Sequence, residues 1–484
     1  IIISQGTGAN VTIPAGDVKA VYLDGAGSGA AVTDAFASLN VVDLKVEDDL
    51  TVTDDVSVGG DAAVTGALTG GTVNGVGINA IESESILISN DGGTGTISSA
   101  LRNTGFGFEA FDDLTSGDDN TAVGRRALTK LTTGSNNVAV GSGCVELTTT
   151  GSDNTAIGYT ALYANTTASS NTAVGKGALS VNTTGDQNTA AGGASMDANT
   201  TGRNNAAYGF QSLSANTTAD ENCAIGVNSL FSNTTGTSNT GLGTYSLQNN
   251  STANNNTGLG HKALFANTTG ASNTAIGRDA LVDNTTGTNN VAIGENALAN
   301  NTTASENTAV GQNALLTNTT GGNLVAVGHD CLRLNTTGSN SVAIGLDAMR
   351  SNTEGANNVA IGHEALDANT TANNNTAVGY VALGANTTGT NNVAVGSTCL
   401  DANTTGDQNV GVGRDALSAN TTAGNGTAVG YVALQANTTG SDNTGVGAST
   451  LRYNTTGASN TAVGVRAGED IDNGDRNTCI GVLA

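Results

Sequence analysis

Bulky aromatic side chains and prolines are nearly absent from this 484-residue sequence. It has no tryptophan, one proline, and only 3% aromatic residues. Large globular cores are built mainly around bulky aromatic and aliphatic side chains, so the composition disfavours a set of ordinary compact domains. Hydrophobic residues nevertheless make up 37% of the chain, which is too many for a disordered low-complexity segment. Small apolar residues at regular intervals instead favour a thin structure with a narrow core.

Basic residues are also scarce. Lys and Arg total 16 against 41 Asp and Glu, which gives a formal net charge of −25. Nucleic-acid binding requires a basic face that neutralises phosphates, and no window supplies one, so neither nucleic acid nor an anionic membrane surface is an expected partner. No run of about 18 apolar residues predicts a membrane span. The charge indicates solubility and repulsion between long particles.

The two ends of the sequence lack the features of a complete polypeptide. The chain begins with Ile1, no signal peptide is recognisable, and the chain stops at Ala484 inside a repeat. We therefore expect the natural polypeptide to extend beyond both ends.

What the sequence does contain is a 17-residue repeat that starts at Asn103. Its strand-ending glycine falls at Gly107 and then every 17 residues up to Gly481, which makes 23 copies without an insertion or deletion. The consensus is N-T-A-V-G-x-x-A-L-x-x-N-T-T-G-x-x, numbered here as positions 1 to 17, and residues 273–289 match it almost intact. Units stacked on identical units cannot change length without losing register, so the unbroken period predicts a solenoid.

Seventeen residues are too few for a helix-turn-helix repeat of about 34 and suit one coil that contains two short strands. Positions 1 to 5 predict the first strand, and the Ala-Leu of positions 8 and 9 predicts the second. Side chains alternate along a strand, so positions 2 and 4 share one face. We expect Val or Ile at position 4 to meet the Leu inside the coil. The small residues at position 3 then face outward, where they predict close packing of partner chains.

Two glycines and an Asn-Thr-Thr segment define the predicted turns. Position 5 is Gly in every copy, which predicts a positive φ or a lack of room for a Cβ atom. Stacked Asn side chains of the N-T-T turn are expected to form amide ladders. At about 4.8 Å a coil, the rod should be on the order of 110 Å long. A positive φ is not expected at position 15, because Ala replaces Gly in six copies: Ala168, Ala219, Ala253, Ala304, Ala372 and Ala423.

The first 102 residues lack this repeat. We interpret residues 1–43 as an N-terminal attachment or cap element, 44–72 as a slender β-shaft with a six-residue period, 73–102 as a transition segment, and 103–484 as the stalk. Gly25 to Ala30 matches G-x-G-x-x-A, a pattern of dinucleotide-binding loops. The rest of that unit is missing because the shaft begins within about ten residues of its end, so a cap element is favoured over nucleotide binding.

The residues that carry chemistry are few, and we predict no catalytic, cofactor-binding or metal site and no enzyme. The three histidines share the variable position 6, and the nearest two lie two coils apart, about 10 Å, which is too far for a shared metal. The cysteines match no zinc or redox motif and are predicted to be small buried hydrophobes. These histidines and cysteines are His261, His329, His363, Cys144, Cys223, Cys331, Cys399 and Cys479. Four acidic pairs could bind calcium, but we favour their interpretation as solvated acids in turns: Asp48-Asp49, Asp54-Asp55, Asp112-Asp113 and Asp118-Asp119.

The strand N-[TV]-A-[VI]-G resembles the N-S-V-A-I-G repeat of YadA-type trimeric autotransporter heads. The resemblance covers residues 103–484 and implies a left-handed parallel β-roll that is trimeric. The coils of that family are a few residues shorter, which implies a longer outer turn around N-T-T-G here. The whole chain, with VYLDGAGSGAAVTDAF, the six-residue shaft and long NTAVGxxAL arrays, is similar to bacteriophage tail fibres.

The tail-fibre resemblance implies a structural homotrimer located in the virion. Its N-terminal region would join tail or other virion proteins. A distal tip outside this chain would bind a host surface glycan or protein, and a self-cleaving chaperone would follow the stalk. We therefore expect a fibre stalk that extends a host-recognition tip for adsorption to the bacterial surface.

Three other functions are weighed against the stalk. An autotransporter-type adhesin would place the chain on the bacterial cell surface and need a membrane anchor. An ice-binding solenoid would use Thr ladders, but Thr-Thr lies in a turn. A glycan-cleaving tailspike is disfavoured because such enzymes use clustered carboxylates and aromatic platforms.

Overall fold

The computed structural model describes residues 99–484 and seven short strands that precede them. The chain divides into two units, Ile1–Gly66 and Ala67–Ala484. In the first unit, β1 pairs with β2 and β3 pairs with β4, both antiparallel. Their bounds are β1 Ile2–Ile3, β2 Val11–Thr12, β3 Val21–Leu23 and β4 Val32–Asp34. The glycine pattern at 25–30 and nearly all of the predicted shaft at 44–72 lie outside the described residues.

The second unit begins with β5 (Thr72–Val73), β6 (Val76–Asn79) and β7 (Ile86–Ser89), which pair as an antiparallel meander. β7 then pairs in parallel with β8, the first strand of the repeat. Within the predicted transition segment, the structure thus describes a small sheet that continues directly into the sheet of the solenoid.

The repeat forms one parallel sheet of 23 three-residue strands, each paired with the next along the chain. In every pair a residue lies opposite its equivalent 17 positions later, as Thr274 lies opposite Val291. The strands are β8 Thr104–Phe106, β9 Thr121–Val123, β10 Val138–Val140, β11 Thr155–Ile157, β12 Thr172–Val174, β13 Thr189–Ala191, β14 Ala206–Tyr208, β15 Cys223–Ile225, β16 Thr240–Leu242, β17 Thr257–Leu259, β18 Thr274–Ile276, β19 Val291–Ile293, β20 Thr308–Val310, β21 Val325–Val327, β22 Val342–Ile344, β23 Val359–Ile361, β24 Thr376–Val378, β25 Val393–Val395, β26 Val410–Val412, β27 Thr427–Val429, β28 Thr444–Val446, β29 Thr461–Val463 and β30 Thr478–Ile480.

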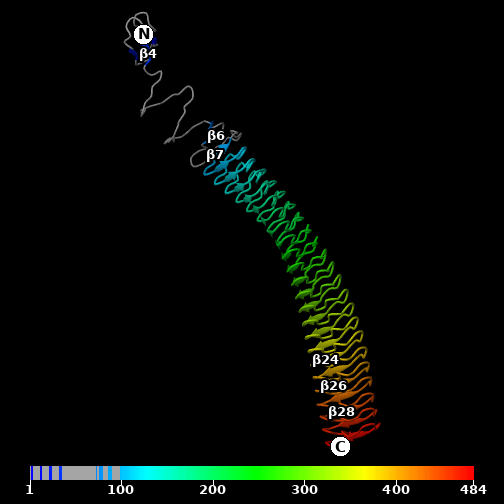
Figure 1. Cartoon of the computed structure of the whole chain (residues 1–484). Coiled ribbons are helices and arrows are strands. Elements are labelled where there is room, and N and C mark those ends of the chain that lie inside the picture. Colours follow the sequence, from blue (N-terminus) through cyan, green and yellow to red (C-terminus); the bar gives the residue numbers. More distant parts are fainter. Residues whose placement is uncertain are drawn as a thin grey trace. The chain divides into compact units, whose positions relative to one another are not determined.

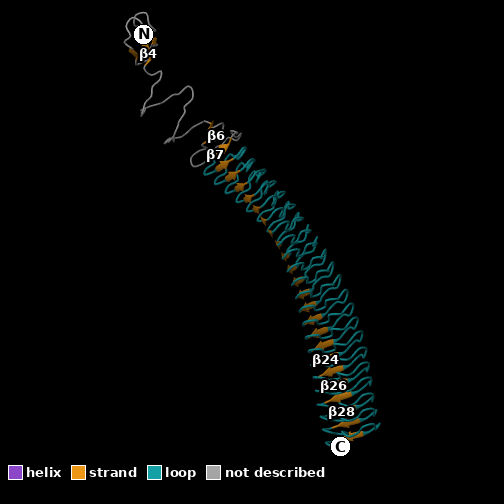
Figure 2. Cartoon of the chain, in the orientation of Figure 1, coloured by secondary structure: helices purple, strands orange, loops and turns teal. Residues whose placement is uncertain are grey.

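The coils of this unit stack into an elongated, gently curved rod (Figure 1). Strands run in a single row along one side, and turns make up the rest of each coil (Figure 2). The described residues contain no helix. The all-β fold is confirmed: a parallel solenoid of 17-residue coils.

The second strand that we predicted at positions 8 and 9 is wrong, because each coil has one strand and a long irregular turn. Leu281, at position 9, has a φ of +51°, which no β-strand residue adopts. Positions 7 and 17 are also left-handed, at +56° for Asp279 and +58° for Asn289. These reversals close the coil with a single extended segment. Hydrogen bonds between coils hold the turns, as from Leu281 N to Ala297 O at 3.0 Å.

The strand-ending glycine has both properties that we expected of it. Gly277 has a φ of +134°, and a Cβ atom there would lie 2.5 Å from the carbonyl oxygen of Gly294 in the next coil. Gly270, at position 15, is not left-handed, which fits the Ala found there in other copies.

The faces of the strand are the reverse of our prediction. Ala275, at position 3, is fully buried, as are Ala280 and Leu281 at positions 8 and 9. Position 4 instead points outward, and Ile293 there is 37% exposed. The reason lies in the width of the coil: one strand faces a close-lying turn, and Leu already fills the space between them. Only small residues fit opposite that Leu.

Buried asparagines complete the interior, and the amide ladder predicted for the N-T-T turn is confirmed. At position 12, Asn284 Nδ2 donates to Asn267 Oδ1 at 2.8 Å and to Gly287 O at 3.0 Å. A second ladder, which we did not predict, runs at position 1, where Asn290 Nδ2 donates to Asn273 Oδ1 at 3.2 Å. Two amide columns thus run through the core beside the Leu column. Buried amides are tolerated because their polar atoms find partners in the adjacent coils.

Candidate functional site

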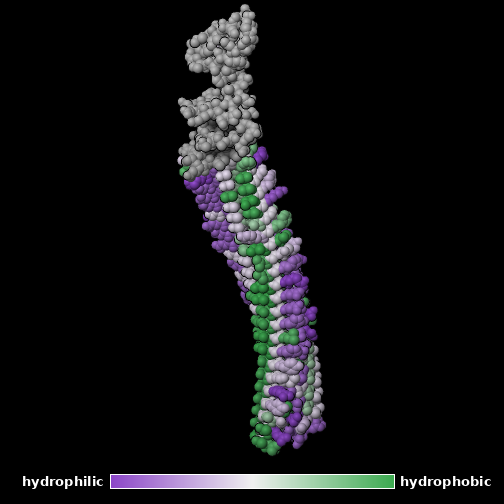
Figure 3. Space-filling view, turned by 60° about the vertical axis from the view of Figure 1, so that its left-hand side comes forward, coloured by the Kyte–Doolittle hydropathy of each residue, from purple (hydrophilic) through white to green (hydrophobic). Residues whose placement is uncertain are grey.

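An apolar stripe runs along the outer face of the sheet and consists of the position 4 side chains. This position is Val, Ile, Leu, Phe or Tyr in every strand from β8 to β30 except β13, which has Ala191. Most of these side chains are between 36% and 44% exposed, and Phe106 and Ile480 at the two ends are more exposed. Figure 3 shows the stripe as a nearly continuous green band along the rod.

The stripe is large for a soluble protein surface. With about two-fifths of each side chain exposed, the row presents on the order of 1,000 Å² of apolar surface, whereas isolated soluble proteins rarely expose more than a few hundred in one patch. Position 2, which is Thr or Val in most coils, borders the stripe on the same face. Exposed apolar patches of this size are typical of interaction surfaces.

A second exposed surface, which we call the variable edge, consists of positions 6, 7 and 10 in the turn after each strand. Its residue types differ from coil to coil, and they interact between neighbouring coils. Arg126, for example, lies 2.8 Å from Glu109 and 3.0 Å from Glu146. The histidines lie here as predicted: His261 and His329 are exposed, and the side chain of His363 is 40% exposed.

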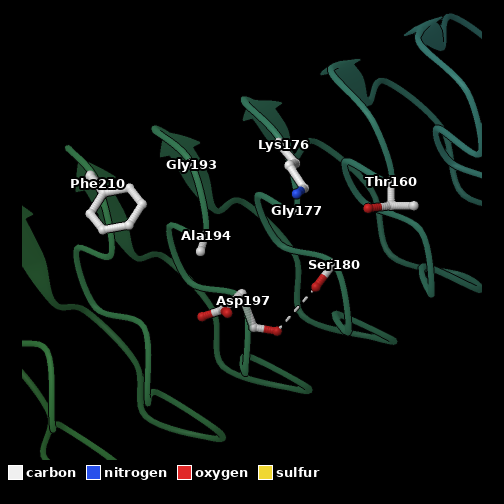
Figure 4. A pocket seen from close by; sticks show the side chains of 8 residues that line it. All are labelled: Thr160, Lys176, Gly177, Ser180, Gly193, Ala194, Asp197 and Phe210. Carbon is white, nitrogen blue, oxygen red and sulfur yellow. Dashed lines mark hydrogen bonds between the residues drawn. The ribbon is translucent and has the colours of Figure 1, made fainter.

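The variable edge is hollowed where glycines replace its side chains. The hollow measures about 260 Å³ and opens above Gly177 and Gly193 (Figure 4). The ring of Phe210 flanks it, with Cδ2 3.5 Å from where a Cβ atom of residue 193 would lie. The other lining side chains come from Thr160, Lys176, Ser180, Ala194 and Asp197. An aromatic edge with hydroxyl and charged groups suits contact with a small polar ligand.

The cysteines are all unpaired, and three are buried as predicted. Cys144, Cys331 and Cys399 occupy position 8 and are fully buried. Burial raises the pKa of each of these thiols to about 12, which removes the reactive thiolate at neutral pH. Cys223 and Cys479 lie in strands and are half-buried.

Two of the acidic pairs lie in the described part of the chain, and their carboxylates are in contact with protein groups. Asp113 lies 3.0 Å from Lys130 Nζ. Asp119 lies 2.6 Å from Arg102 Nε, and the hydrogen bond from Arg102 holds the pKa of Asp119 below its ordinary value. The pairs Asp48-Asp49 and Asp54-Asp55 lie outside the described residues.

The structure brings together one group that our sequence reasoning missed. His329, Asp330 and Asp347 place one nitrogen and two carboxylate oxygens within 4.8 Å of one another. The spacing between histidines does not reveal this group, because only one histidine takes part in it. The sequence pattern that could have revealed it is a histidine at position 6 followed by an acidic residue at position 7, with a second acidic residue at position 7 of the next coil.

The comparisons with known proteins add no further constraint on the function. No family model, no curated protein and no solved structure matches the chain. No helix in the described residues is long and apolar enough to cross a membrane. The stripe, the variable edge and the histidine–aspartate group are therefore the observations on which functional proposals rest.

Proposed function

We propose that the chain is the stalk of a homotrimeric fibre, the tail fibre of a phage virion. The observation that carries this proposal is the apolar stripe, which follows an uninterrupted solenoid from end to end. A solenoid of constant repeat length supplies a long spacer. A stripe of matching length supplies a surface along which identical chains associate.

The stripe supports association of the chains on a common axis. It is about one side chain wide, with position 2 beside it, so each chain presents a narrow ridge and not a broad flat face. Three such ridges converging on an axis cover one another on both sides. This corrects the predicted interface: the position 3 residues that we expected to meet are buried inside each coil, and position 4 takes their place.

The area is sufficient for stable assembly. Covering on the order of 1,000 Å² of apolar surface per chain is worth about 25 kcal/mol at 25 cal/mol per Å². Loss of rotational and translational freedom opposes association by roughly 4–15 kcal/mol. The difference favours a complex that dissociates slowly, because the contact is repeated along the whole rod.

In this proposal the remaining surfaces face solvent and vary with little effect on assembly. The N-terminal region joins the virion, and a tip beyond the stalk carries host recognition, as the tail-fibre resemblance implies. The chain then acts by holding that tip at a fixed distance from the particle.

The proposal is tested by measuring mass and shape. Light scattering coupled to size-exclusion chromatography should give three times 47.4 kDa, about 142 kDa, and electron microscopy should show thin rods. A variant in which Lys replaces three stripe residues, Ile293, Ile344 and Val395, should have the mass of one folded chain. The matched control replaces three position 11 residues with Lys, namely Val181, Leu334 and Tyr453, which are 40–48% exposed and lie outside the stripe. This variant should remain a trimer.

A wild-type monomer in this measurement would refute the proposal. So would a stripe variant that remains a trimer while circular dichroism shows an intact fold. A bacterial surface adhesin is the second candidate, because the same stripe would serve it. Immunogold labelling separates the two: label on virion fibres supports the stalk, and label on uninfected cells supports the adhesin.

A further inference from the structure

One cluster on the variable edge joins two successive coils through groups that bind metals. His329 and Asp330 occupy positions 6 and 7 of one coil, and Asp347 occupies position 7 of the next. His329 Nδ1 lies 3.7 Å from Asp330 Oδ2, which is too long for a hydrogen bond. The backbone holds the two coils in register here, because Asp347 N donates to His329 O at 3.1 Å.

We propose that His329, Asp330 and Asp347 bind a divalent transition-metal cation of the Zn²⁺ type. Nitrogen and oxygen ligands bind Zn²⁺ at about 2.0–2.2 Å, so two ligand atoms of a tetrahedral site lie about 3.4 Å apart. The three atoms already lie within 4.8 Å of one another, so side-chain shifts of roughly 1 Å complete the set. Water takes the remaining coordination position.

The neighbouring residues prepare Asp330 as a ligand. Asn313 Nδ2, one coil earlier, donates to Asp330 Oδ1 at 2.9 Å, which leaves Oδ2 directed to the site. Hydrogen bonds of this kind orient ligating carboxylates. Asp330 as a whole is only 9% exposed, so its carboxylate is held in place.

Arg333 is the cation that now compensates this carboxylate. Its Nη1 lies 3.6 Å from Asp330 Oδ2, beyond hydrogen-bonding distance, and its side chain is 41% exposed. A bound metal therefore displaces a loose contact, and the guanidinium can turn to water.

The choice of ion follows from the imidazole. Carboxylates and water alone suit Ca²⁺ and Mg²⁺, whereas an imidazole ligand favours Zn²⁺, Ni²⁺ and similar ions. A site that depends on His329 should thus prefer Zn²⁺ to Ca²⁺ strongly.

The repeat provides two natural comparisons at the same position. His363 lies 3.8 Å from Glu364, an equivalent pair, but position 7 of the next coil is Val381. His261 is followed by Lys262, which repels a cation. Among these three histidines, His329 alone has a carboxylate at position 7 of both its own and the following coil. The site at His329 therefore depends on Asp347, the ligand that the other two histidines lack in this combination.

Calorimetric titration of the full chain with ZnCl₂ tests the proposal. We expect one saturable site per chain, at least about tenfold weaker in His329→Ala and in Asp347→Val and unchanged in His363→Ala. Val381→Asp should complete the His363 group and raise the stoichiometry to two per chain. Circular dichroism checks that each variant keeps its fold.

Three results would overturn the inference: no saturable binding of Zn²⁺, wild-type affinity in His329→Ala, or full competition by equimolar Ca²⁺. The last would mean that exposed acids alone attract the ion. Hydrogen exchange gives an independent readout, because a cation held by residues of two coils should slow exchange in the segment 329–347 and not in 363–381.

Discussion

Replacing one buried asparagine should loosen one junction between coils and leave the rest of the rod folded. Asn290 Oδ1 accepts the backbone N–H of Asn307 in the next coil at 3.1 Å. In Asn290→Ala this buried N–H loses that acceptor. Two other partners of Asn290 keep bonds of their own: Asn273 Oδ1 still accepts the N–H of residue 290 at 3.0 Å, and Ala304 O still accepts Asn301 Nδ2 at 3.0 Å.

The expected loss of stability follows from the hydrogen bonds that Asn290→Ala removes. One orphaned buried N–H costs about 1–3 kcal/mol, and the lost amide bonds add about 1 kcal/mol. Local opening should thus become easier by roughly 2–4 kcal/mol. At 1.4 kcal/mol for each tenfold change, protection of the Asn307 amide against hydrogen exchange should fall on the order of 30- to 700-fold.

Hydrogen exchange followed by mass spectrometry measures this on peptides that cover residues 300–312. Asn300→Ala is the matched control, because Asn300 is exposed at position 11 and should leave protection unchanged. The fold should persist, since Leu324, Ser341 and Gly426 interrupt the same column in the natural chain. Unchanged protection at Asn307, or loss of structure along the whole rod, would show that the ladders do not stabilise coils one by one.

Three further outcomes are expected. Gly277→Ala should destabilise its coil by more than about 3 kcal/mol in denaturant titrations, because the new Cβ would meet the carbonyl of Gly294 and the residue would have to keep a positive φ. The raised thiol pKa values of Cys144, Cys331 and Cys399 mean that the unfolded chain loses protons above pH 9 while the folded chain keeps them to about pH 12. Stability that is complete below pH 9 should fall between those values, and thiol reagents should modify these three only after unfolding. Deleting two coils, residues 274–307, should shorten the rod by roughly 10 Å in electron micrographs without unfolding it.

The period of the repeat was sufficient to predict the architecture. Unbroken spacing from Gly107 to Gly481 requires in-register stacking, and the structure shows that register in every strand pair of the repeat. The glycine at position 5 was predictable too, since a residue needed for both its φ and its lack of a Cβ cannot vary. The single strand per coil was not predictable, because Leu281 adopts a left-handed conformation that Leu ordinarily avoids.

Which face of the strand lies inside is a separate question that alternation alone does not answer. Alternation places positions 1 and 3 together and positions 2 and 4 together, but either pair can face inward. Hydrophobicity favoured position 4. The Asn at position 1 favours the other pair, because amide columns are most stable where water is excluded. Giving the Asn more weight than the Val would have placed Ala275 inside, as found.

In the proposed trimer, this arrangement of the two strand faces would separate folding from assembly. The amide, Ala and Leu columns are completed by contacts within one chain, so a single chain has the interactions that it needs to keep its coils stacked. Among the described residues, the position 4 column has no such partner, and its apolar surface would leave water only where another surface covers it. Charged substitutions in the stripe should therefore yield folded single chains, whereas substitutions in the Asn columns should loosen coils inside an intact assembly.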